Sequence, residues 1–148
     1  MKLREFLKKI DHDQIKEAIR QAEYQTSGEI RVHIEEKLGK KDPFERAVAV
    51  FHKLKMNNTA LRNGVLIYIA TGEQYVTVIG DAGINELVDE NYWEDVIGII
   101  TKSFKAGKFT EGICNGILKI GEKLKELFPY QADDVNELPD DISTGDIG

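Results

Sequence analysis

One acidic residue of this sequence occupies a position where an acid needs a specific partner. Asp81 follows an apolar stretch and lies between Gly80 and Gly83. Because a protein interior does not hold an unpaired carboxylate cheaply, Asp81 needs backbone N–H groups, a cation or another polar ligand. It could cap a helical turn that begins near Gly83, or it could be the centre of a binding site. The residue types alone leave both interpretations open.

The strands around Asp81 decide which other polar groups lie near it. The alternation of residues 29–35 predicts a strand with one buried face and one solvent-exposed or partly exposed face. The continuous apolar run of residues 64–70 predicts a strand covered on both faces, and residues 75–80 predict the returning strand of a hairpin. In the first strand the expected buried residues are Ile30, Val32 and Ile34, and the expected outer residues are Glu29, Arg31, His33 and Glu35.

The connections between these strands bring three segments together. Asp42 and Pro43 are typical of a helix start, so a helix separates the first two strands and predicts a right-handed parallel crossover. The tight hairpin makes the third strand antiparallel to the second. Residues 27–29, 62–64 and 80–83 are therefore expected to meet at one edge of the sheet, each segment with a glycine and an oxygen-bearing side chain.

Helical spacing of apolar residues predicts the remaining elements. We expect a short helix near residues 3–10, a helix capped by Asp11, a helix over residues 92–105 and a last helix capped by Thr110. Cys114 is expected to be a buried thiol. The residues expected in the core also include the stripe Phe44, Ala47, Val48, Phe51 and Leu54, and the aromatic residues Trp93, Phe104 and Phe109.

Composition limits the class of protein. The 148 residues suffice for one domain, expected over residues 1–131, and no apolar run approaches a membrane span. The net charge of −6 lies entirely in residues 132–148, an expected solvating tail, so the neutral body offers no basic stripe for nucleic acid. A single cysteine and the absence of a recognisable signal peptide favour a cytoplasmic location.

Several separate motifs resemble the TPM domain family, which is named for a thylakoid lumen protein, a photosystem II repair factor and a nematode receptor modulator. The motifs are "TSGEIRVHIEE", "ALRNGVLIYIA", "IGDAGINELV", the tryptophan that follows, and "FKAGKFTEGI". The chain looks like the short bacterial members without export signal or membrane helix. The resemblance implies an α/β/α sandwich with a mixed sheet, which agrees with the strands expected above. It also implies divalent-metal binding, with calcium in described members, and an acid phosphatase activity proposed for the plant lumen member.

The residues at the expected edge are of a type that such a metal would accept. Calcium prefers carboxylate, amide and backbone oxygens, so the resemblance makes Asp81, Asn63 and Glu29 candidate ligands, with Glu86 and Asp89 on the following turn. Magnesium remains a second possibility, and the spacing is not that of an EF-hand. Simpler interpretations stay open: Glu29 as a solvated charge paired with Arg31 or Arg62, Asn63 as turn chemistry, and the last two as surface acids.

Two functions follow from these expectations. The first is a small metal-binding module that also meets a protein partner. The alternative is a metal-assisted acid phosphatase, in which Arg62 or Arg31 holds a phosphate while Asp81 binds the metal or attacks. The sequence contains no recognisable phosphatase nucleophile motif and no P-loop, and its histidines lack metal-ligand spacing. His33 beside Arg31 is the one histidine that could face a phosphate, and the catalytic residues stay unassigned.

Overall fold

The computed structural model describes residues 1–37, 39–130 and 142–145. The helices are α1 (Leu3–Lys8), α2 (His12–Glu23), α3 (Pro43–Lys53), α4 (Ala82–Asn85), α5 (Tyr92–Lys105) and α6 (Phe109–Leu127), with a 3-10 turn η1 (Thr71–Glu73). The strands are β1 (Glu29–Glu35), β2 (Gly64–Ala70), β3 (Tyr75–Gly80) and β4 (Ile142–Thr144). Within the described part of the chain, no helix combines the length and the apolar composition that a bilayer span requires.

The four strands form one mixed sheet in the order β3-β2-β1-β4. β1 and β2 are parallel, with Glu29 opposite Gly64, and β2 and β3 are antiparallel, with Val65 opposite Gly80. The parallel crossover and the hairpin predicted from the sequence are therefore confirmed. They place the start of β1, the start of β2 and the end of β3 at the same edge of the sheet.

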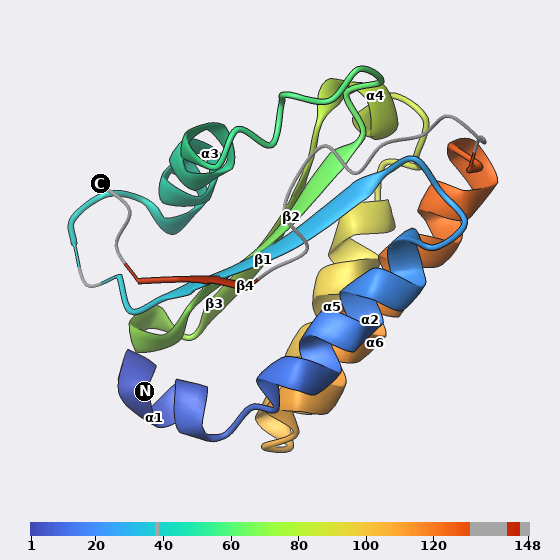
Figure 1. Ribbon diagram of the computed structural model, residues 1–148. Helices are drawn as coiled ribbons and strands as arrows, with labels where there is room; N and C mark the ends of the chain where they lie inside the picture. The colour runs from blue at the N-terminus through green and yellow to red at the C-terminus, as the bar shows by residue number, and fades with distance from the viewer. Residues whose placement is uncertain (38, 131–141, 146–148) are drawn as a thin grey trace.

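Helices cover both faces of this sheet. Helices α2, α5 and α6 lie on one face and α3 lies on the other, which makes the α/β/α sandwich expected above (Figure 1). β2 is buried along its whole length, as its continuous apolar run predicts. Its alternate residues divide between two cores. Ile67 and its neighbours on that face join the larger core beneath α2, α5 and α6, whereas Leu66 and Tyr68 join the smaller core beneath α3.

Most helix starts agree with the sequence, and two details differ. Asp11 and Asp42 cap α2 and α3 with their side chains, as expected. Thr110 is not a cap, because α6 already begins at Phe109 and the Thr110 hydroxyl instead accepts a hydrogen bond from the Asp11 backbone N–H at 3.0 Å. Phe44 has the spacing of a core residue but is 50% exposed, because α3 turns its first-turn phenylalanine away from the sheet.

The second face of β1 is buried except at Arg31, which is partly exposed, so of the two forms expected for this face the solvent-exposed one is wrong. His33 is fully buried, and Glu29 and Glu35 are each 4% exposed. Helix α3 lies on this side of the sheet, mainly against β2 and β3, and supplies Arg46 as a charged partner for Glu35. The polar alternation therefore marks a face with internal partners, since buried charges are stable when they are paired.

Three residues of the expected tail belong to the sheet. Ile142–Thr144 form β4, which pairs in parallel with Val32–Ile34 on the free side of β1. Ile142 packs against the larger core. An otherwise unpaired strand edge needs backbone partners, which explains why this part of the tail is ordered against β1. Within the expected tail, residues 132–141 and 146–148 lie outside the described residues.

Candidate functional site

The three segments expected to converge do meet at one edge of the sheet. The backbone N–H of Glu29 donates to the Asn63 carbonyl at 3.4 Å, and the N–H of Asp81 donates to the Gly64 carbonyl at 2.9 Å. The N–H of Gly83 donates to the Arg62 carbonyl at 2.8 Å. These bonds confirm the convergence predicted from strand order and join the edge into one backbone network.

Asn63 is a buried residue that connects two of the segments at this edge. Its side chain is 1% exposed, and its amide oxygen accepts a hydrogen bond from the Thr59 hydroxyl at 3.2 Å. Its amide nitrogen donates to the Ser27 hydroxyl at 3.3 Å, across the gap between the first and second segments. Asn63 therefore does more than shape a turn, because it ties two of the three converging segments together.

Asp81 is both a helix cap and one half of an ion pair. Its Oδ1 accepts a hydrogen bond from the Ala82 backbone N–H at 2.8 Å, which starts α4 and confirms the cap interpretation. The Arg62 guanidinium donates two bonds to the same carboxylate, from Nε at 2.6 Å and from Nη2 at 2.8 Å. These hydrogen bonds raise the pKa of Arg62 above its ordinary value. Asp81 is 6% exposed, whereas the Arg62 side chain is 50% exposed. Arg62 therefore lies between Asp81 and the solvent.

Close backbone contacts hold this pair in place. A Cβ on Gly83 would lie 2.0 Å from the Leu61 carbonyl oxygen, so only glycine fits there. Gly80 likewise lies against the Trp93 ring: a Cβ on Gly80 would be 2.3 Å from the ring atom Cζ2. Arg62 itself has a φ of 52°, in the left-handed region that non-glycine residues seldom adopt. The turn is therefore shaped so that the Arg62 side chain leaves the backbone toward Asp81.

The remaining candidate ligands are distributed around this pair. Glu29 is buried, so its interpretation as a solvated charge is wrong. Glu86 follows the last residue of α4 and is exposed, and Asp89 is also exposed. No group of three or more His, Cys, Asp or Glu side chains within the described ranges is arranged to hold a metal ion. Asp81 already has a positive partner, the Arg62 guanidinium.

Exposed apolar side chains flank the ion pair. Leu61, which precedes Arg62, is 51% exposed, and Leu87, which follows α4, is 55% exposed. The Trp93 indole nitrogen donates a hydrogen bond to the side-chain oxygen of Asn85 at 2.8 Å. This bond connects α5 to α4.

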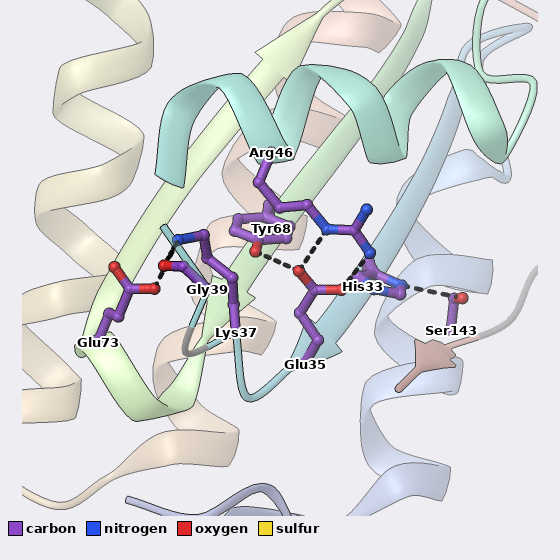
Figure 2. A network of polar contacts seen from close by, with 8 residues as sticks. All are labelled: His33, Glu35, Lys37, Gly39, Arg46, Tyr68, Glu73 and Ser143. Atoms are coloured by element: carbon purple, nitrogen blue, oxygen red, sulfur yellow. Dashed lines mark hydrogen bonds and ion pairs between the residues drawn. The ribbon is translucent and has the colours of Figure 1, made fainter. Parts of the chain in front are cut away.

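A second polar cluster lies inside the molecule, between β1 and α3 (Figure 2). The Glu35 carboxylate accepts hydrogen bonds from Arg46 at 2.8 and 2.9 Å, from the Tyr68 hydroxyl at 2.5 Å and from His33 Nε2 at 3.0 Å. The other ring nitrogen of His33 lies 3.0 Å from the Ser143 hydroxyl of β4. This cluster therefore links β1, β2, α3 and β4 through one carboxylate.

The environment of Glu35 keeps it ionised. Burial raises the pKa of Glu35, but the hydrogen bonds from His33, Arg46 and Tyr68 outweigh burial and lower the pKa to about 2. Burial and the hydrogen bond to Glu35 raise the pKa of Tyr68 far above its ordinary value. Since both groups hold one protonation state at neutral pH and neither is accessible, the cluster is suited to fastening elements together and not to proton transfer with a substrate.

The sequence indicates some of these residues and misses others. It points to Arg62 as a partner of a phosphate or of Glu29, but not to its bond with Asp81. His33 does not face a cleft beside Arg31, because it is fully buried and its ring stacks with that of Tyr68, with 6.1 Å between the ring centroids. In the sequence, Glu35 has the position of a surface acid. Its spacing of two residues from His33 places both side chains on one face of the strand. The sequence does not show that a helix lies on that side of the sheet. Cys114 is a buried thiol, as expected, and burial raises its pKa.

Comparison with known proteins identifies the family. The family model of the TPM domain matches residues 2–123. The NMR structure of the BA42 protein from the psychrophilic bacterium Bizionia argentinensis is 47% identical, with a TM-score of 0.84, over 90% of this chain and 92% of that one. The N-terminal domain of a P. gingivalis protein is 16% identical with a TM-score of 0.67, over 82% of each chain, and shows the fold alone. No curated protein matches the chain. The chain belongs to the TPM domain family.

Proposed function

We propose that this TPM domain is a binding module whose binding surface is the edge of the sheet around Arg62 and Asp81. The observation that carries the proposal is the ion pair itself: a carboxylate that is 6% exposed is covered by a guanidinium whose side chain is 50% exposed. Arg62 can leave the pair by moving into solvent without disturbing the core. Asp81 would then face the solvent from a turn that Asn63 and the backbone network hold in place.

A divalent cation, calcium before magnesium, is the small ligand that we propose for this edge. Asp81 supplies a hard carboxylate oxygen of the kind that calcium prefers, and Arg62 occupies the position where a positive charge is needed. With one carboxylate and the remaining positions taken by backbone oxygens and water, we expect a weak site, with a dissociation constant on the order of 1 mM. The cation and Arg62 are then alternative partners of Asp81.

Thermal unfolding with chelator or with added calcium tests this competition. At about ten times the dissociation constant, calcium should stabilise the wild type by about 1.4 kcal/mol. Arg62→Gln removes the competing charge, so the variant should be less stable in chelator and should gain more from calcium than the wild type. Asp81→Asn retains the cap but not the charge, so its melting should not respond. A flat response in both the wild type and Arg62→Gln would refute cation binding at this edge.

The exposed leucines support a protein partner on the same surface. Leu61 precedes Arg62 in the chain and Leu87 follows α4, and an interface centre that included them would combine apolar contact with the charge of the ion pair. Replacing both leucines by serine should leave the calcium response intact, because a leucine side chain has no oxygen to offer a cation. It should abolish co-purification with a partner that the wild type retains. The double variant thus separates cation binding from partner binding.

Acid phosphatase activity is the alternative function implied by the family resemblance. Arg62 is the group that could hold a phosphate here, since it is exposed and positively charged. His33, the one histidine with a suggested phosphate role, is fully buried in the Glu35 cluster and cannot act as an acid at this edge. Hydrolysis of a generic phosphate ester across acidic and neutral pH, lost in Asp81→Asn, would favour the enzyme over the binding module.

A further inference from the structure

The end of the β2–β3 hairpin opposite Asp81 contains a cavity that the proposed function does not use. It lies where η1 meets α1 and α5, whereas Asp81 and α4 lie at the other end of the same two strands (Figure 1). Its volume is about 300 Å³. That volume is at the small end of the range of cavities that bind small molecules in proteins.

The wall of the cavity is mainly apolar. Phe6, Phe104 and Phe109 line it as one aromatic cluster, with ring centroids 5.0 to 5.7 Å apart. Ile69 and Val76 of the hairpin complete the apolar wall. The three rings come from α1, α5 and α6, so the wall is fixed by packed helices and not by a loop. Such a wall favours the hydrocarbon part of a ligand.

Two polar groups at the cavity lack partners. Thr71 lines the cavity and is 4% exposed, yet its hydroxyl has no hydrogen-bond partner among the described residues. A buried hydroxyl without a partner is costly, and rotation about its Cα–Cβ bond can turn it toward a bound molecule. Lys105, in the last turn of α5, also lines the cavity and makes no ion pair with any residue that the structure describes. Both groups can donate a hydrogen bond, and among the described residues no acidic side chain lines the cavity.

We propose that this cavity binds a small monocarboxylate with an aliphatic chain. The chain lies against the wall of phenylalanine rings, and the carboxylate accepts hydrogen bonds from the Thr71 hydroxyl and the Lys105 ammonium group. Two unpaired donors without an acid select an anionic head group over a neutral or cationic one. The volume of the cavity, about 300 Å³, suits a chain of medium length.

Titration with octanoate, followed by amide NMR shifts, tests the proposal in the full chain. We expect saturable shifts at Ile69–Val76 and in the last turn of α5, and weaker binding of octan-1-ol, which lacks the carboxylate. Thr71→Val exchanges the hydroxyl for a methyl group, so it should weaken octanoate binding about tenfold without lowering the melting temperature. Thr71→Ser keeps the hydroxyl and should bind as the wild type does. Lys105→Gln, at an exposed position, should weaken octanoate about two- to fivefold and leave octanol unchanged.

A blocking variant provides the structural control. Thr101 lines the cavity, and its hydroxyl bonds only to carbonyl groups of its own helix, so Thr101→Phe fills the space without leaving a distant partner unpaired. This variant should keep the far-ultraviolet circular dichroism of the wild type and lose octanoate binding. The proposal is overturned if octanoate causes no saturable shifts near the cavity, if Thr71→Val binds it as tightly as Thr71→Ser, or if octanol binds as tightly as octanoate.

Discussion

Replacing Glu35 by glutamine should change how the stability of the protein depends on pH. The glutamine side chain would keep the size of the original and could still accept hydrogen bonds, but it would lack the charge that Arg46 contacts at 2.8 Å. The pKa of Glu35 falls from 4.5 to about 2 on folding. One pKa unit corresponds to about 1.4 kcal/mol, so the ionised carboxylate contributes about 3 kcal/mol to the free energy of unfolding.

The direction of the pH effect follows from the lowered pKa. A carboxylate whose pKa is lower in the folded state stabilises the protein fully above its unfolded pKa, and this contribution is lost as the pH falls through the folded pKa. For Glu35 the window runs from 4.5 down to about 2. Above this window Glu35→Gln should be about 3 kcal/mol less stable than the wild type, in line with removal of one partner from a buried pair. Toward pH 2 the two proteins should converge, because protonated glutamate resembles glutamine.

Urea unfolding at several pH values measures this difference, with Trp93, the single tryptophan, as the fluorescent probe. Glu122→Gln, on an exposed position of α6, is the matched control and should follow the wild type at every pH. A constant difference between Glu35→Gln and the wild type from neutral to acidic pH would refute the reasoning, because the loss would then not depend on ionisation. So would a variant as stable as the wild type at neutral pH.

Two further predictions concern the site edge and β4. Gly83→Ala places a Cβ 2.0 Å from the Leu61 carbonyl oxygen and should cost more than about 2 kcal/mol in urea unfolding, whereas Gly98→Ala, with open space around it in α5, should stabilise by about 0.5–1 kcal/mol. If both glycines tolerate alanine equally, the close contact at the Asp81 turn is wrong. Ser143→Ala removes the hydroxyl that lies 3.0 Å from the His33 ring and should speed hydrogen exchange of the β4 amides, with a global cost of about 1 kcal/mol. Unchanged exchange would show that backbone pairing alone holds β4.

The sequence predicted the features that depend on local pattern and chain connection. The alternation in Glu29–Glu35, the unbroken apolar run of Gly64–Ala70 and the short turn before Tyr75 specify three strands, and strand direction then specifies which ends meet. The convergence around Asp81 followed from these features, and the cap was one of the two interpretations of Asp81 that the residue types left open. Both are consequences of neighbouring residues and of short connections, which sequence patterns record directly.

The features that depend on distant partners could not be predicted in this way. Glu35 and His33 look like outer residues of a strand, and only the position of Arg46 on a covering helix makes them internal. The pairing of Arg62 with Asp81 depends on the left-handed backbone conformation of Arg62. An arginine in the sequence does not predict this conformation. β4 follows an acidic stretch, and its pairing with β1 becomes evident only when the strand order leaves that edge of β1 open.

Calcium titration of isotope-labelled wild-type protein and Arg62→Gln, followed by amide NMR shifts, tests the binding edge most directly. We predict saturable shifts at Asn63, Gly64 and Gly80–Gly83 in both proteins, with Arg62→Gln saturating at a lower calcium concentration because Asp81 no longer has its guanidinium partner. Asp81→Asn should show none of these shifts. Shifts confined to the exposed acids Glu86 and Asp89, or shifts in this turn that persist in Asp81→Asn, would contradict the assignment of Asp81 as the centre of the site.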